Sequence, residues 1–236
     1  MNTTHAMTTP VITNELALLE TLVPLAGARL IEAGCGAAHL ARELVGRHEG
    51  AEVVGIEVDD RQLAKNRANP VDRLRFERAG AESIPFADAS FDGALMLKSL
   101  HHVPMPLMDQ ALSELARVLR PGGWLYVSEP VYAGELNELI RLFNDEGVVR
   151  AAAQAALDRA IASGLWAAAA EHRFETPVGF ASFEEFEQRM MRPTFADHGI
   201  DAAMLERVRA RYLPHQGPDG ARFSRPMHVR LLRRTR

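Results

Sequence analysis

Hydrophobic and polar positions follow two periods along the first half of the chain. Short apolar runs with the length of buried strands occur near 29–33, 52–57, 74–79, 91–97 and 123–129. Segments with apolar residues three and four positions apart predict helices, near 14–22, 38–48, 60–68 and 106–120. Strands that alternate with helices in this way imply a parallel sheet with right-handed crossovers.

The pattern changes after Pro130. Residues 134–170 are rich in alanine and predict two helices, broken near Gly147 and Gly164. The remaining elements are expected to be a strand at 173–180, helices at 183–191 and 202–212, and a closing strand at 227–233. We therefore expect a mostly helical segment before the last strand.

The first strand runs directly into a glycine turn and a helix. Leu30-Ile31-Glu32-Ala33-Gly34-Cys35-Gly36 indicates a buried strand that ends in an acid, and the helical run 37–45 follows. Such a turn lets a ligand approach the backbone and the unpaired N–H groups of a helix start. Glu32 would repel a pyrophosphate, and a dinucleotide motif would need glycine or alanine where His39 stands. A ligand with a positive end and hydroxyls fits better.

A second acid follows at the distance expected for a ribose contact. The apolar run 53–58 contains Glu57, about twenty residues beyond the glycines, where doubly wound folds place a ribose-binding carboxylate. A polar residue that merely ends a strand would look the same. Both interpretations of Glu57 stay open on this spacing alone.

Three further segments complete an ordered set, at 79–92, 93–104 and 117–128. Together with the glycine turn and Glu57, they resemble the class I S-adenosylmethionine-dependent methyltransferases. The set is most similar to the ubiquinone/menaquinone biosynthesis (type 11) branch, and residues 29–130 carry it. The resemblance implies an α/β fold: a doubly wound, Rossmann-like, seven-stranded, mostly parallel sheet with an antiparallel C-terminal hairpin and a helical cap insertion.

The resemblance also implies a single methyltransferase domain over residues 1–236. Its expected parts are an N-terminal helix segment, a cofactor-binding core, a helical cap with an edge strand, and a closing strand, at 1–28, 29–130, 131–215 and 216–236.

The implied cofactor is S-adenosylmethionine, with S-adenosylhomocysteine as its product. Glu32, Gly34 and Gly36 would hold the methionine part, with Cys35 packed beside it, and Glu57 would bind the ribose hydroxyls. The family often has a third glycine where this chain has alanine at position 38, which is harmless if that residue is already helical.

The adenine would lie against Val58 and meet Ala81 and Glu82 at its edge. The family usually has an aspartate where this chain has Gly80, which leaves Glu82 as the nearest acid. Leu97 would line the cofactor together with Lys98, at the end of the fourth strand.

Two histidines follow the fourth strand at its carboxyl end. His101 or His102 could act as a general base, although such a pair could equally order the loop through backbone hydrogen bonds. Glu129, Tyr132 and Arg141 are candidate contacts of the methyl acceptor, with ordinary packing as the alternative.

We expect the segment 134–212 to form a lid over the carboxyl ends of the fourth and fifth strands. Its apolar content, including Phe143 and Trp166, suits a pocket for a partly apolar small molecule. The rival interpretation is a homodimer interface, which would also need apolar helices.

Composition and net charge limit the kinds of partner and cellular location that we expect for this chain. The formal net charge of −4 and a pI of about 6.1 disfavour a nucleic-acid surface, and no run reaches the ~20 apolar residues of a membrane span. Residues 1–10 lack the features of a secretory signal, and a single cysteine favours a reducing cytoplasm. No metal-ligand spacing of histidine and cysteine is found.

The expected function is therefore S-adenosylmethionine-dependent methyl transfer to a small-molecule acceptor. One alternative is a protein that binds S-adenosylmethionine, or a carboxylated analogue, without methylating a small molecule. The other is methylation of tRNA or protein.

Overall fold

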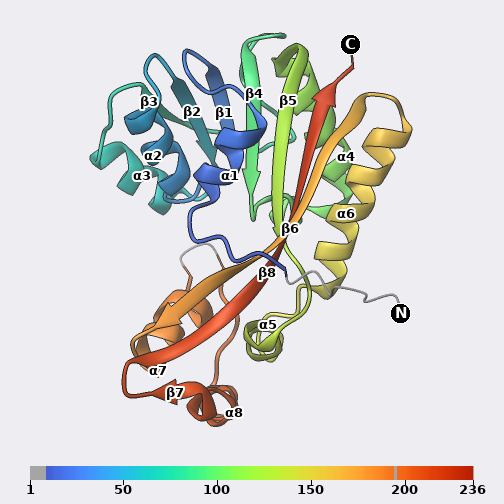
Figure 1. Ribbon diagram of the computed structural model, residues 1–236. Helices are drawn as coiled ribbons and strands as arrows, with labels where there is room; N and C mark the ends of the chain where they lie inside the picture. Colours follow the sequence, from blue (N-terminus) through green and yellow to red (C-terminus); the bar gives the residue numbers. More distant parts are fainter. Residues whose placement is uncertain (1–8, 194–195, 236) are drawn as a thin grey trace, which may run out of the picture.

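The computed structural model describes residues 9–193 and 196–235, and it is built around one twisted sheet (Figure 1). The strand order is β3-β2-β1-β4-β5-β8-β6, with β1 to β5 parallel, β8 antiparallel to both of its neighbours, and the short β7 paired with β8. The strands are β1 (Arg29–Ala33), β2 (Glu52–Glu57), β3 (Leu74–Arg78), β4 (Phe91–Leu97), β5 (Leu119–Pro130), β6 (Trp166–Phe180), β7 (Gln216–Gly217) and β8 (Gly220–Arg234). The predicted doubly wound sheet with antiparallel C-terminal strands is confirmed.

Helices connect the strands. The α-helices are α1 (Glu15–Leu22), α2 (His39–Arg47), α3 (Asp60–Ala68), α4 (Met108–Val118), α5 (Glu135–Ile140), α6 (Gly147–Ala162), α7 (Phe183–Phe186) and α8 (Ala202–Tyr212). Single turns of 3₁₀-helix lie at η1 (Leu100–His102), η2 (Met105–Leu107) and η4 (Leu213–His215), and a π-helical turn forms η3 (Glu187–Met191). Among the described residues, no helix has both the length and the apolar character needed to cross a bilayer.

Both faces of the sheet are buried. Along β1, Leu30 packs into the core that α1 and α2 cover, whereas the next residue, Ile31, packs into the core that α4 and α6 cover. Side chains of a strand point alternately to opposite faces, so a strand covered on both sides reads as a continuous apolar run. This burial makes the sheet a rigid platform whose carboxyl edge can hold a site.

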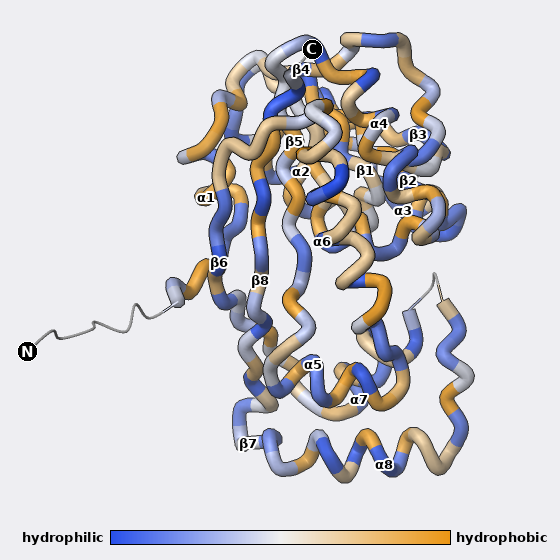
Figure 2. Tube along the Cα trace, turned by 90° about the vertical axis from the view of Figure 1, so that its right-hand side faces the viewer, coloured by the Kyte–Doolittle hydropathy of each residue, from blue (hydrophilic) through white to orange (hydrophobic). Residues whose placement is uncertain are grey.

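The antiparallel strands extend beyond the sheet and carry a second layer of packing. We call α5 and the described part of residues 178–223 the lower lobe; β6 and β8 run side by side from the sheet into it (Figure 1). Its core is aromatic, with Phe180, Phe186 and Tyr212 among its buried members. Helix α8 forms its outer edge and alternates hydrophilic and hydrophobic positions (Figure 2).

The segment expected to form the lid is folded differently. Residues 166–170, expected in a helix, begin β6, and α6 packs beside α4 against the face of the sheet through Ala153 and Leu157. Trp166 is buried in that same core, where its indole N–H donates to the Leu112 carbonyl oxygen (3.3 Å). The segment is thus not one continuous helical lid: α6 packs on the sheet, whereas Arg189 and His198 from its later part line the large pocket described below, and Trp166 lies outside that pocket.

Trp166 should therefore matter for stability. Trp166→Ala should lower the free energy of unfolding by about 3–5 kcal/mol, because it empties a site in which the side chain is 1% exposed. Urea unfolding measures this loss. Val148→Ala, at a position 71% exposed, should change it by less than about 0.5 kcal/mol. Equal effects of the two substitutions would contradict the placement of Trp166.

Candidate functional site

A pocket of about 1400 Å³ lies at the carboxyl ends of β1, β2 and β4. Open α/β sheets bind their ligands at this edge. One wall comes from the turn after β1 and from the loops after β2, β3 and β4. The facing wall comes from the lower lobe, through Gln188, Arg189, Arg192 and His198.

Gly34 and Gly36 in the turn after β1 both have a positive φ, which favours glycine, but only at Gly34 would a side chain also clash with a neighbour. Gly34 has φ +68°, and a Cβ there would lie 2.7 Å from the Cβ of Ser99, so a side chain at position 34 would disturb the fold itself. Gly36 has φ +50°, and a Cβ there would meet nothing within 4 Å. Ala38 was expected to be helical, but it adopts a left-handed conformation with φ 54° and is the N-cap of α2. Glycine would take that conformation with less strain.

The Glu57 carboxylate holds the turn in place. Its Oε2 accepts from the backbone N–H of Gly36 (2.8 Å), and its Oε1 accepts from the N–H groups of Val58 (2.8 Å) and Asp59 (2.9 Å). Asn66 of α3 donates to the carbonyl oxygen of Gly36 (2.7 Å) and fixes the same residue from the other side. An ionised carboxylate offers about four acceptor positions, so Glu57 can still receive a ligand hydroxyl.

Glu32 carries a buried polar atom that lacks a partner. The side chain lines the pocket, and its Oε2 has no hydrogen-bond partner among the described residues. Burial raises the pKa of Glu32 to about 8, against the opposing charge of Lys98. A buried carboxyl with an unused oxygen fits a ligand that brings a cationic hydrogen-bond donor.

The part of the pocket formed by the loops after β2 and β3 carries apolar side chains and the acidic residue Glu82. Val58, 62% exposed, and the buried Ala81 line it. The Glu82 carboxylate lies over Gly80, and a Cβ at position 80 would collide with it. Glu82 therefore occupies the space into which a side chain at position 80 would extend. Leu97 and Lys98 also line the pocket, as expected.

Cys35 contributes little beyond its backbone. Its sulfur packs against Gly55, and an added Cβ on that glycine would lie only 2.8 Å from it. Burial raises the pKa of the thiol. The side chain belongs to the core beneath the pocket and carries no reactive thiolate.

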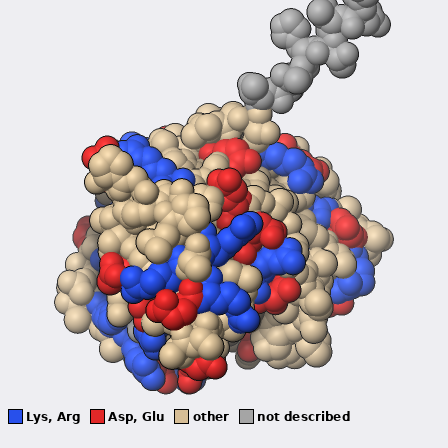
Figure 3. All heavy atoms as spheres, turned by 90° about the horizontal axis from the view of Figure 1, so that it is seen from below, with Lys and Arg blue, Asp and Glu red and all other residues tan. Residues whose placement is uncertain are grey.

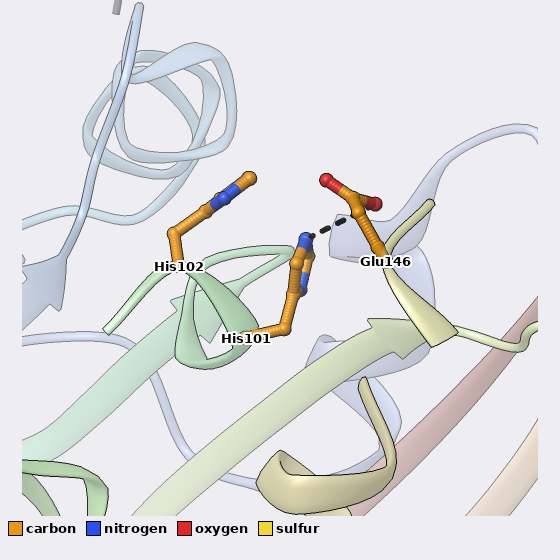
Figure 4. Close-up of side chains that lie close together, drawn as sticks. All are labelled: His101, His102 and Glu146. Atoms are coloured by element: carbon orange, nitrogen blue, oxygen red, sulfur yellow. Dashed lines mark ion pairs between the residues drawn. The ribbon is translucent and has the colours of Figure 1, made fainter. Parts of the chain in front are cut away.

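The two histidines occupy different environments. His101 is buried, and its Nδ1 pairs with Glu129, whose Oε1 also accepts from the Leu100 N–H (2.9 Å). The other ring nitrogen, Nε2, lies 3.9 Å from the Glu146 carboxylate. His102 lines the pocket, and its ring converges with His101 on Glu146 (Figure 4). Enclosure and the neighbouring His101 lower the pKa of His102, which favours its neutral form.

The residues expected to contact the acceptor lie elsewhere. Glu129 is buried behind His101. Tyr132 donates its hydroxyl to Asp145 (2.7 Å) and borders a separate cavity of about 590 Å³, and Arg141 pairs with Glu138 (3.2 Å) and lines neither cavity.

Sequence reasoning missed several residues of the site. Asn66 is a buried polar residue on an otherwise polar helix, and no spacing identifies it. The lower-lobe wall falls within the segment 134–212 that was expected to form the acceptor pocket, but Arg189 and His198 lie some 150 residues beyond the glycine turn, so no local pattern identified these two residues. Only the course of β6 and β8 brings them to the pocket.

Comparison with known proteins identifies the core. A family model described as a methyltransferase domain matches residues 31–127. Methyltransferase GfsG of Streptomyces halstedii is 39% identical over 127 residues, which are 52% of this chain and 45% of that protein. The 27-O-demethylrifamycin SV methyltransferase of Amycolatopsis mediterranei is 38% identical over 114 residues, 46% of this chain and 41% of that protein.

The similarity of fold extends further than the similarity of sequence. The YcgJ protein of Bacillus subtilis superposes with a TM-score of 0.65 at 19% identity and covers 93% of this chain and 97% of that one. The chain spans less than half the length of the two curated relatives. The matched residues carry the glycine turn and Glu57, whereas the lower-lobe wall lies outside the match.

The raised pKa of Glu32 predicts a pH-dependent stability. Between about pH 4.5 and about 8 the folded chain keeps a proton that the unfolded chain has released. This contribution is complete at low pH and is lost as the pH rises through about 8, with a slope of at most about 1.4 kcal/mol per pH unit. Glu32→Gln, which stays neutral, should lack the slope. Urea unfolding from pH 5 to 8.5 measures it, and parallel profiles would contradict the prediction.

Proposed function

We propose that this chain, which belongs to the class I S-adenosylmethionine-dependent methyltransferases, transfers the methyl group of S-adenosylmethionine to an oxygen of a small-molecule acceptor. The observation that carries the proposal is the unpartnered Oε2 of Glu32, buried beside an open glycine turn in the pocket. An amino acid ammonium is the kind of group that such an atom would bind.

The described residues fit the parts of the cofactor. Glu32 would pair with its ammonium, and Gly36 leaves open space at the turn. Glu57 would accept the ribose hydroxyls, the exposed face of Val58 would lie against the adenine, and Glu82 would meet its edge. When bound, the cofactor supplies an activated methyl group on a sulfonium. The protein contributes chiefly orientation and the exclusion of water.

The acceptor would lie between His102 and the lower-lobe wall. Of the two candidate histidines, only His102 lines the pocket, so the role next to the acceptor is proposed for it and not for His101. Arg189, Arg192 and His198 make the wall polar. The 27-O-demethylrifamycin SV methyltransferase, a relative over the core, supports an oxygen acceptor on a small molecule.

A nucleic-acid acceptor has less support. The face seen in Figure 3 carries basic and acidic side chains next to one another. In the lower lobe, Arg189 pairs with Glu185 and Arg209 pairs with Glu184. A surface that binds RNA would present a basic field. Binding of a carboxylated cofactor analogue would need spare positive charge; Arg189 and Arg192 are already paired with glutamates, and Lys98 lies near the carboxyl of Glu32.

The single cysteine supports a reducing compartment. Cys35 is a free, buried thiol in a chain without a second cysteine. We therefore include a cytoplasmic location in the proposal.

Cofactor binding can be tested at Glu57. S-adenosylhomocysteine should bind the wild type in calorimetry, whereas NAD should give no heat. Glu57→Ala should weaken binding by about 2 kcal/mol, or about 30-fold, because a ligand hydroxyl loses a charged acceptor and Gly36 loses its support. Glu52→Ala, at the exposed start of the same strand, is the matched control. Binding of NAD instead, or equal effects of both variants, would refute the assignment.

Cofactor binding should also release a proton from Glu32. At pH 6.5–7 the carboxyl starts out protonated, and a bound ammonium favours its ionised form. Calorimetric heats of S-adenosylhomocysteine binding in buffers of different ionisation enthalpy should report about one proton released per site. Glu32→Gln should bind more weakly with almost no release. The same release from both proteins would show that the ammonium lies elsewhere.

A further inference from the structure

His101 is a buried imidazole with a carboxylate at each ring nitrogen. Its Nδ1 pairs with Glu129, and its Nε2 lies 3.9 Å from the Glu146 Oε2. If the ring is neutral and its Nδ1–H donates to Glu129, then Nε2 carries a lone pair. That lone pair points toward a second carboxylate, Glu146. A separation of 3.9 Å is too long for an N–H···O hydrogen bond, and it leaves room for a cation bound to both atoms.

We propose that His101, His102 and Glu146 bind a divalent first-row transition metal ion of the zinc class. One ligand atom from each residue lies within 4.8 Å of the other two, and the three side chains point toward a common centre (Figure 4). Ligands about 2.0–2.2 Å from a zinc ion are separated from one another by roughly 3–4 Å. A small contraction of the cluster would therefore bring the three ligand atoms to the distances that zinc requires.

The surroundings match those of a metal site. Glu129 would orient His101 and fix its tautomer, and Glu129 is itself held by the Leu100 N–H. Carboxylate–histidine–metal arrangements of this kind accompany most histidine ligands. Glu146 is oriented by Asn144 (2.9 Å) and Arg150 (2.6 Å). Arg150 pairs with Glu146 and Arg225 lies close enough to interact with it, so the two glutamates balance these cations and a metal ion would rely on the two imidazole nitrogens as well as on charge.

The donor set selects the class of ion. Two imidazoles and one carboxylate suit zinc, cobalt or iron(II), whereas magnesium and calcium prefer oxygen ligands. Three protein ligands leave coordination positions open, as in catalytic rather than structural sites. His102 and Glu146 both line the large pocket, so these positions would face the place proposed for the acceptor. That use rests on the proposed function, but metal binding itself does not.

Metal binding is tested on the full chain after treatment with a chelator and desalting. Calorimetry with ZnCl₂ should show about one equivalent bound, and Co²⁺ should develop visible absorption bands of a histidine-bound ion. Glu146→Gln and His102→Ala should each weaken Zn²⁺ binding on the order of tenfold or more, and Glu129→Gln on the order of 10–100-fold through His101.

The matched control is His215→Ala. His215 Nδ1 also lies 3.9 Å from a glutamate, Glu135, but among the described residues it belongs to no cluster of three potential metal ligands. This variant should keep full affinity for Zn²⁺. Thermal unfolding and S-adenosylhomocysteine binding verify that each variant is folded, so a loss of Zn²⁺ alone reports on the site.

The outcomes separate the two proposals. No Zn²⁺ binding by the wild type, or affinity unchanged in both Glu146→Gln and His102→Ala, would overturn the metal site, and His101 would then be bridged by a proton. Retained binding of S-adenosylhomocysteine by the metal-free chain would leave the proposed function intact. Zn²⁺ binding without binding of that compound would overturn the cofactor assignment and keep the metal site.

Discussion

The hydrogen bonds that backbone N–H groups donate to the Glu57 carboxylate are the constraint on which the rest of the site depends. One side chain joins the end of β2 to the turn after β1, and Asn66 fixes that turn from the other side. The turn can then keep its left-handed glycines and leave an open cradle above them. Without this tie, the position of Gly36 and the space above it would not be fixed.

The pocket is lined by two parts of the chain that have separate cores. The sheet, buried on both faces, supplies the half that the methyltransferase family shares, and the match to residues 31–127 falls there. The lower lobe has its own aromatic core and supplies the opposite wall. The cofactor contacts and the acceptor contacts proposed above would thus come from separately packed parts of the chain.

Local signals made the first half of the site predictable. Glu32 and Glu57 lie at the ends of β1 and β2, and Gly34 and Gly36 lie in the turn after β1, so short stretches of sequence sufficed to predict that they line one pocket. The alanine-rich residues 166–170 misled, because their helix propensity was overridden by pairing with β8 and by the burial of Trp166, so that they form the start of β6. The approach of Glu146 to the histidine pair left no trace in spacing, since more than forty residues separate them.

The long ribbon of β6 and β8 makes the depth of the pocket a matter of strand length. Both strands continue without interruption from the sheet into the lower lobe, so the lobe stands at a distance set by the number of residue pairs between them. Each added pair would extend the ribbon by about 3.4 Å, and two pairs would restore the same facing of every side chain some 7 Å farther out. Insertion of two residues into both β6 and β8 would therefore enlarge the space for an acceptor and leave the residues around the glycine turn unchanged.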